Sequence, residues 1–444
     1  LITHLKVVNM EYSLNHGNVY VDGELKKINI LVRNGKIEKL SETALEQGEI
    51  IDCTKKWVIP GAIDPHVHFR TPGGEYKEDW STGSQAAAAG GVTTVVDMPN
   101  TNPPTTSVSR LEEKRQIVRK QSLVNFGFHF GASPGNIEEV KAVKGIVGIK
   151  VYFGSTTGNL LVNQPDYLRE LFEISKVPLL FHAENDRLIG ENRKKVEELG
   201  IKDYRVHGMI RNVEVARSAV EEILGLAAGF DKRVYFCHVS TQAEMELILS
   251  AKDRLDVYCE VTPHHLFLTE EILKDIGFFG KVNPPLREEK DRDYVYKALL
   301  NGDIDCMGTD HAPHAKDEKQ QVYDKAPSGM PGLETMLPLL LTEVHRGNMS
   351  LSRLIELSSE TPAKVFSMKN KAYIKPGYDG DLVVVDPAKS YVISQKNLFS
   401  KSGWNPFEGR EVTGSIDLTM VLGQPAYRDG RCLSVRGEEV ICES

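Results

Sequence analysis

No run of apolar residues in this chain approaches the roughly 20 that a membrane-spanning helix needs. Positive charge is not in excess either. The chain has 54 Lys and Arg against 62 Asp and Glu, and its net charge of −8 argues against a nucleic acid or an anionic membrane as partner. The first residues show no long apolar segment followed by a small-residue cleavage site, so we expect no signal peptide. Met10 fits a natural start as well as Leu1 does.

Cysteine is also scarce, and its spacing forms no CxxC pair. In a chain of 444 residues without an export signal, this pattern is typical of free thiols in a reducing cytoplasm, where we expect the protein to act. The six cysteines are Cys53, Cys237, Cys259, Cys306, Cys432 and Cys442. A glycine-rich dinucleotide or phosphate loop is missing as well, since none follows the first strand of the central region.

The two ends of the chain carry short β patterns. Near the N-terminus, Asn34-Gly35 is a strong hairpin signal that follows a strand-like run. Near the C-terminus, a turn-rich stretch leads into the apolar run Leu382–Asp386, and a further run lies near Thr419–Leu422. We infer that residues 1–58 and 369–444 meet as one small β-sandwich domain.

The central region, residues 59–368, alternates strands with helices. Its strands are nearly continuous apolar runs, as expected for strands that are covered on both faces. Helical patterns such as Trp80–Ala89 and Val213–Ala228 lie between them. This alternation predicts a closed (β/α)8 barrel, with an open doubly wound sheet as the alternative. The predicted strands are Ile63–Phe69, Thr93–Met98, Asn125–Phe130, Gly148–Phe153, Leu179–Ala183, Val234–Val239, Val257–Val261 and Ile304–Gly308.

Metal-binding side chains lie at the ends of several of these strands. His66 and His68 form an HxH pair, and because side chains alternate along a strand, both imidazoles face the same side. A barrel brings its strand ends to one mouth, so these positions favour the barrel. Ligands rich in nitrogen and oxygen suit zinc. The other candidates of this kind are Lys150, His182, His238 and Asp310.

The histidines divide into two groups. His66 and His68 suit one metal ion together with Asp310, while His182 and His238 suit a second. Two zinc ions would polarise a carbonyl and activate water, and Asp310 could accept a proton and pass it to a leaving nitrogen. This chemistry fits hydrolysis of an amide or the reverse ring closure.

Lys150 is the unusual member of the group. A protonated ammonium has no lone pair for a metal ion, so by itself this lysine is interpreted as one that snorkels at a strand end. Cys237 and Glu260 also lie at or beside strand ends, where a further metal contact is conceivable. Packing of Cys237 as a small core residue is the simpler interpretation.

Other polar residues near the strand ends are candidates for substrate binding. Arg70 follows the HxH pair by two residues, and its guanidinium suits a carboxylate, with a surface salt bridge as the alternative. Asn100 lies just past the second strand and could add a contact or be an ordinary turn residue. His314 is a candidate substrate contact, and His311 is a candidate to orient Asp310.

These residues stand in motifs that resemble the dihydroorotases, a family of cyclic amidohydrolases. The motifs are Asp64–Arg70 with Pro72–Asp79, Gly91–Thr101, Gly148–Tyr152, Gly308–His314 and Ala326–Glu334. The first two resemble the family's early signatures, and the third resembles the strand of members with a carboxylated lysine. The fourth is similar to the signature around the catalytic aspartate, and the last to a loop whose backbone holds the pyrimidine ring.

The resemblance implies the reversible ring closure of N-carbamoyl-L-aspartate to L-dihydroorotate in pyrimidine (UMP) biosynthesis. It implies two zinc ions bridged by a carboxylated Lys150, a small-molecule substrate, and a homo-oligomer as an open alternative. For the substrate it implies Arg70, Asn100 and His314 on the carboxylate and Asn283 as a further pocket residue. A loop at residues 154–159, with Thr156 and Thr157, would close over the substrate.

Two other functions remain open at this point. Allantoinases and dihydropyrimidinases share the expected fold and metal ligands, but they lack the Arg two residues after HxH and the Pro-Asn-Thr run, so Arg70 and Asn100 argue against them. A non-catalytic relative that acts as a partner protein would be expected to lose metal ligands, and none is missing from this sequence.

Overall fold

A computed structural model of the chain describes residues 11–155 and 160–442. Within them, eight parallel strands form a nearly closed barrel in which each strand pairs with the next along the chain. Residues just beyond the first and last strands approach each other, with a hydrogen bond of 2.8 Å from the backbone N of His68 to the O of His311. The predicted (β/α)8 barrel is therefore confirmed, and the alternative of an open doubly wound sheet is excluded. Its strands are β8 (Ala62–Val67), β9 (Val92–Asp97), β10 (Asn125–Gly131), β11 (Gly148–Tyr152), β12 (Leu179–His182), β13 (Val234–Phe236), β14 (Val257–Val261) and β15 (Cys306–Met307).

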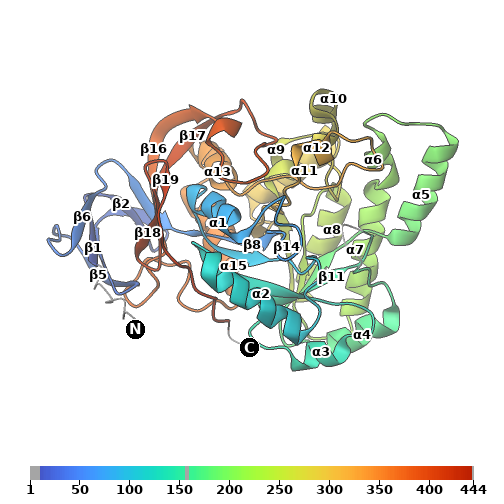
Figure 1. The fold of residues 1–444 in the computed structure, drawn as a ribbon, viewed down its shortest axis with the longest axis horizontal. Coiled ribbons are helices and arrows are strands. Elements are labelled where there is room, and N and C mark those ends of the chain that lie inside the picture. Colours follow the sequence, from blue (N-terminus) through green and yellow to red (C-terminus); the bar gives the residue numbers. More distant parts are fainter. Residues whose placement is uncertain (1–10, 156–159, 443–444) are drawn as a thin grey trace.

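Helices follow the barrel strands and cover the outside of the barrel (Figure 1). Their N-termini carry the capping side chains that the sequence offers: Thr241 and Glu244 form a capping box at α8, and Asp79 caps α1. No helix in the described ranges is long and apolar enough to cross a membrane. The longer helices are α1 (Trp80–Ala89), α2 (Val108–Gln121), α4 (Pro165–Ile174), α5 (Asp186–Glu198), α7 (Val213–Ala227), α8 (Gln242–Lys252), α11 (Glu289–Asn301) and α13 (Met336–His345). The shorter ones are α3 (Ile137–Ala142), α6 (Val206–Ile210), α9 (Pro263–Phe267), α10 (Leu273–Ile276), α12 (Lys316–Lys319), α14 (Leu351–Ile355) and α15 (Thr361–Val365).

Six of the eight barrel strands end one to three residues earlier than the sequence pattern predicts. β13 stops at Phe236 rather than Val239, and β15 spans only Cys306–Met307. His238 and Asp310, which follow these strands, have φ angles of 37° and 46°. Residues with a Cβ are strained in this left-handed region, so the chain leaves strand geometry there. These two candidate ligands thus lie just beyond their strands.

The two ends of the chain form a β-sandwich, as predicted. A four-stranded sheet, β5-β4-β1-β6, faces part of a seven-stranded sheet, β19-β18-β17-β16-β7-β2-β3, across a core that includes Ile30, Val384 and Met420. Figure 1 shows the blue N-terminal and red C-terminal strands side by side next to the barrel. The strands are β1 (Glu11–Asn15), β2 (Asn18–Val21), β3 (Glu24–Lys27), β4 (Asn29–Arg33), β5 (Lys36–Ser41), β6 (Glu49–Asp52), β7 (Trp57–Pro60), β16 (Leu382–Val392), β17 (Glu411–Val421), β18 (Gln424–Arg428) and β19 (Arg431–Cys432).

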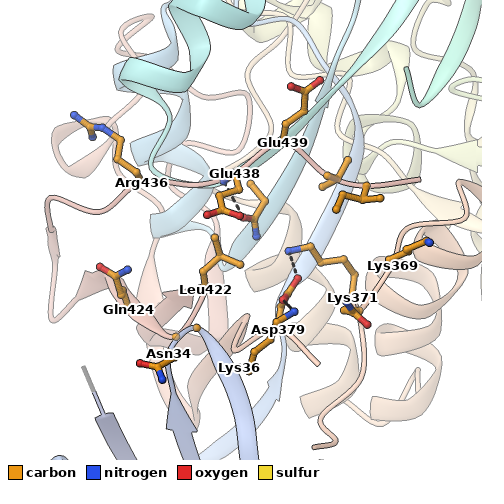
Figure 2. Close-up of a pocket in the computed structure, with 16 residues that line it drawn as sticks. Asn34, Lys36, Lys369, Lys371, Asp379, Leu422, Gln424, Arg436, Glu438 and Glu439 are labelled. Atoms are coloured by element: carbon orange, nitrogen blue, oxygen red, sulfur yellow. Dashed lines mark hydrogen bonds and ion pairs between the residues drawn. The ribbon is translucent and has the colours of Figure 1, made fainter. Parts of the chain in front are cut away.

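The last described residues return to the barrel. The backbone N of Phe126 in β10 donates to the O of Glu438 at 3.0 Å, and the N of Val440 donates to the O of Phe126 at 2.8 Å. A pocket of about 620 Å³ lies between this segment and the sandwich (Figure 2). The buried Lys371 of its wall is paired, since its Nζ lies 2.8 Å from the half-buried Asp379 and 2.6 Å from the buried Asp381 nearby. The division into domains at residues 58/59 and 368/369 stays a prediction.

Candidate active site

A cavity of about 30 Å³ lies where the carboxyl ends of the barrel strands converge. The predicted metal ligands His66, His68, Lys150, His182, His238 and Asp310 all line it. Arg70, Asn100 and Asn283 line it as well, together with Tyr152, Val282, Ala312, Ser328 and Gly329. His314 lies behind Arg70 rather than in the wall, with its Nε2 at 3.2 Å from the Nη2 of Arg70. The barrel thus brings together side chains that are far apart in the sequence.

The HxH pair shares one carboxylate. The Oδ1 of Asp310 lies 2.9 Å from the Nε2 of His68 and 3.3 Å from the Nε2 of His66. The Nδ1 of His68 lies 2.7 Å from the Oδ1 of Asn100, which fixes the orientation of its ring. Burial alone would raise the pKa of Asp310, but His66, His68 and His238 hold that pKa well below its usual range. The carboxylate is therefore ionised and faces the cavity.

The second pair of histidines lies on the neighbouring strands. The Nδ1 of His182 lies 3.0 Å from the Nε2 of His238, and the Nε2 of His182 lies 2.9 Å from the carboxylate of Glu184. Burial and neighbouring positive charge lower the pKa of His238 well below that of free histidine, so its imidazole is neutral. Its buried Nδ1 has no hydrogen-bond partner among the described residues.

Lys150 lies among these histidines, with no exposed surface. Its Nζ donates to the Sγ of Cys237 at 2.9 Å and lies 5.3 Å from the centre of the Tyr152 ring. A fully buried lysine does not snorkel to solvent, so the simpler interpretation of Lys150 from sequence is wrong. Cys237 is buried as expected for a core residue, but it borders the site.

Glu260 is a buried carboxylate that supports the site. It contacts the Nδ1 of His66 and accepts hydrogen bonds from the backbone N of His238 at 3.1 Å and from the hydroxyl of Tyr235 at 2.9 Å. Burial raises the pKa of Glu260 to about 7. Ligand atoms of His66, Cys237 and Glu260 lie within 4.8 Å of one another, as do those of His66, His238 and Asp310. The sequence signal for Glu260 was only its place on a strand beside the site.

The guanidinium of Arg70 contacts a backbone carbonyl and an imidazole. Its side chain is buried, its φ is 61°, and its Nε donates to the O of Pro313 at 3.2 Å. Among the described residues, no carboxylate lies within 4.0 Å of this guanidinium. β8 ends at Val67, so Arg70 reaches the cavity from a strained loop position and not from the strand. The surface salt bridge considered for Arg70 is therefore ruled out.

Some sequence-based roles change with the structure. The ring of His311 faces other groups than the carboxylate of Asp310; its Nδ1 accepts from the N of Gly332 at 3.1 Å, and its Nε2 lies 3.4 Å from Glu78. The sequence analysis also missed Tyr152, whose buried hydroxyl lines the cavity without a partner in the described part of the chain. Its position two residues after Lys150 on the same strand was the available signal. Thr156 and Thr157 lie outside the described residues.

A (β/α)8 barrel whose strand ends gather four buried histidines around a buried aspartate defines a class of metal-dependent hydrolases. Within that class, a family model described as the amidohydrolase family matches residues 57–426, and the chain belongs to this family. It is 38% identical to a dihydroorotase of Methanothermobacter thermautotrophicus over 438 residues, covering 97% of this chain and 98% of that protein. It is also 38% identical to a dihydroorotase of Methanosarcina acetivorans, covering 90% of this chain and 88% of that protein.

Solved structures with the same fold carry different names. An L-hydantoinase (dihydropyrimidinase) from Arthrobacter aurescens has a TM-score of 0.93 and 31% identity, covering 97% of this chain and 99% of that one. A dihydropyrimidinase from Brevibacillus agri has a TM-score of 0.90 and 26% identity, covering 97% and 98%. The sequence relatives are thus named dihydroorotase, whereas these solved structures are named hydantoinase or dihydropyrimidinase.

Proposed function

We propose that this chain is a dihydroorotase, which catalyses the reversible ring closure of N-carbamoyl-L-aspartate to L-dihydroorotate. The observation that carries the choice is the buried Arg70 guanidinium, which lines the cavity without a carboxylate partner among the described residues. Burying an unpaired cation is costly, so such a group suits a substrate that brings its own carboxylate. The sequence relatives named dihydroorotase support the same choice.

A hydantoinase or dihydropyrimidinase activity is the second candidate, because the solved structures described above carry those names. Their named substrates are rings without a carboxylate, which would leave Arg70 unpaired after binding. The unpaired guanidinium therefore favours an acidic ring.

A metal centre fits the residues of the cavity. Neutral imidazoles and an ionised carboxylate are ligands that zinc accepts, and the partnerless Nδ1 of His238 marks a buried polar atom that the described residues leave unsatisfied. We assign His66, His68 and Asp310 to one ion and His182 and His238 to a second, with a carboxylated Lys150 as the bridge. When bound, such ions supply Lewis-acid activation of the amide carbonyl and of water.

The protein's own groups then bind the substrate and move the proton. During ring opening, the oxygen of a water molecule bonds to the ring carbonyl carbon, and the ionised Asp310 accepts a proton from that water at its carboxylate. As the C–N bond breaks, Asp310 gives the proton to the leaving nitrogen, and ring closure reverses these steps. Arg70 and Asn100 bind the substrate carboxylate, and His314 supports Arg70 from behind. Asn283, whose buried Oδ1 has no partner among the described residues, can accept a hydrogen bond from a ring N–H.

The enzyme acts on a small molecule, and we expect it in the cytoplasm, in keeping with its six free thiols. A homo-oligomer stays a possibility that size measurements can address. No role as a non-catalytic partner is proposed, since every predicted ligand lines the cavity.

The decisive experiment is a parallel assay of purified protein, supplied with zinc and bicarbonate, on L-dihydroorotate, dihydrouracil, hydantoin and allantoin. We expect kcat/KM for dihydroorotate to exceed that for each neutral ring by at least about tenfold, the effect of one charge-assisted contact. Faster turnover of a neutral ring would instead support the hydantoinase-type function. Protein stripped of metal serves as the control for background ring opening.

A further inference from the structure

Two loop segments without helix or strand contribute to the cavity wall, Val282–Asn283 and Ser328–Gly329. A backbone hydrogen bond of 2.9 Å from the N of Gly329 to the O of Lys281 joins them. Gly329 has a φ of 145°, and a Cβ there would approach the O of Ala312 to 2.4 Å, so the position requires glycine. The placement of this wall therefore depends on contacts between loops.

Lys319 provides the strongest of these contacts. It lies at the end of α12, its side chain is 1% exposed, and it extends between the two segments. Its Nζ donates to the O of Lys281 at 2.9 Å, the O of Pro327 at 2.9 Å and the O of Gly329 at 3.1 Å. These carbonyls immediately precede or belong to the segments that line the cavity.

The three carbonyls match the three N–H bonds of an ammonium group. Burial lowers the pKa of Lys319 well below that of free lysine, but a neutral amine would leave one carbonyl facing a lone pair. No carboxylate of the described residues lies within 4.0 Å of this Nζ. The Nζ also lies 5.8 Å from the centre of the Trp404 ring. A buried cation held by carbonyls and a ring face is an expensive way to join two loops, which points to a use beyond packing.

We infer that Lys319 is a positioning residue that fixes the distance between Val282–Asn283 and Ser328–Gly329, and so shapes the wall that receives the substrate ring. The inference rests on the proposed function for the identity of the substrate. The three bonds of Lys319 to the loop carbonyls, called the clamp below, can be tested without turnover. The O of Ser328 also lies 3.1 Å from the Nε2 of His314, which contacts Arg70, so the clamp extends to the carboxylate-binding side.

Lys281 offers a matched control. It is also a buried lysine, and its Nζ donates to the O of Tyr323 and the O of Ala326, both at 2.6 Å. The carbonyls of Tyr323 and Ala326 precede the segment Ser328–Gly329 in the chain and do not line the cavity. Replacing either lysine with methionine removes carbonyl contacts while keeping a similar side-chain volume, but only Lys319→Met releases the cavity wall.

The test combines hydrogen exchange with steady-state kinetics on metal-loaded protein. In Lys319→Met we expect faster exchange in peptides that cover residues 327–331, whereas in Lys281→Met the faster exchange should fall on residues 322–326. We expect KM for dihydroorotate to rise at least about tenfold in Lys319→Met, with kcat within about threefold and metal content unchanged. Lys281→Met should change KM less than about threefold, even if its melting temperature falls equally.

Equal exchange in wild type and Lys319→Met, or equal rises of KM in the two variants, would overturn the inference. If Lys319→Met does not fold, Lys319→Gln takes its place. Its shorter side chain has two N–H donors for the three carbonyls and must release at least one of them, so an unchanged KM would then count against the inference. If wild type does not turn over dihydroorotate, the proposed function fails. The exchange pattern still decides whether Lys319 holds the wall.

Discussion

Arg70 is the residue on which the proposed choice of substrate rests. In Arg70→Met, losing a charge-assisted contact in a partly dry site should cost about 1.5–3 kcal/mol, so kcat/KM for dihydroorotate should fall about 10- to 150-fold. Turnover of a neutral ring, where measurable, should fall much less. Zinc content should not change, because Arg70 is not a proposed ligand. An equal loss on acidic and neutral rings would mean that Arg70 acts by packing alone.

The buried hydroxyl of Tyr152 has no hydrogen-bond partner among the described residues and is a candidate donor to the substrate. Burial raises the pKa of Tyr152 well above that of free tyrosine, so the group stays protonated and can donate to a substrate oxygen. Tyr152→Phe removes no hydrogen bond within the described residues, so its melting temperature should match or exceed that of wild type. Its kcat/KM should fall about 2- to 10-fold, the value of one neutral hydrogen bond.

Tyr167→Phe is the matched control for this substitution. The Tyr167 hydroxyl bonds to the Oδ1 of Asn136 at 2.6 Å, outside the cavity. Its loss should lower stability by about 0.5–1.5 kcal/mol and leave kcat/KM unchanged. Unchanged kcat/KM in Tyr152→Phe would show that this hydroxyl does not meet the substrate.

Among the elements, the C-terminal segment that pairs with β10 depends on one glycine. A Cβ at Gly437 would lie 1.9 Å from the O of Val124, so Gly437→Ala must push the segment away from the barrel. We expect a loss of about 1–3 kcal/mol in the free energy of unfolding, measured with denaturant. Gly190→Ala, inside α5 with no atom within 4 Å of its Cβ, should instead stabilise by about 0.5–1 kcal/mol. Equal effects of the two substitutions would contradict this account.

Glu334 links the start of α13 to the segment at Ser400 and should make stability depend on pH. Its carboxylate accepts from the N of Phe399 and the N of Ser400 at 3.0 Å, and burial raises its pKa to about 7. The unfolded chain has a pKa of about 4.3 at such a group, so the folded state binds the proton more tightly. The resulting stability is fully present below about pH 4.3 and is lost as pH rises through about 7.

Glu334→Gln removes this titration. Relative to wild type, the variant should therefore gain melting temperature between about pH 4.3 and pH 7 and level off above that range. Scanning calorimetry across that range measures the difference, and a constant offset between the two proteins would show that Glu334 titrates normally.

The elements were largely predictable from sequence, whereas the contacts between them were not. Strands such as β10 and helices such as α1 follow from local apolar periodicity and capping residues. The positive φ angles of His238 and Asp310 do not, because they arise from the packing of residues far apart in the chain. The hydrogen bond of Lys319 to Lys281 and those of the C-terminal segment to Phe126 join positions far apart in the chain. Such contacts leave no local pattern in the sequence. The candidate ligands were found because each marks a strand end.

At the scale of the whole molecule, the barrel encloses a set of proposed metal ligands that only folding brings together. Metal ions that bind the folded state alone should stabilise it by about 2.7 kcal/mol at a concentration one hundred times Kd. If a carboxylated Lys150 bridges the ions, full occupancy requires bicarbonate as well as zinc. We therefore expect wild type to hold about two zinc ions per chain with bicarbonate and fewer in buffer depleted of carbon dioxide, with a parallel fall in melting temperature. Lys150→Met should bind less zinc under both conditions and show no response to bicarbonate. Full zinc occupancy of wild type without carbon dioxide would contradict the lysine bridge and leave the histidine and aspartate assignments to be tested on their own.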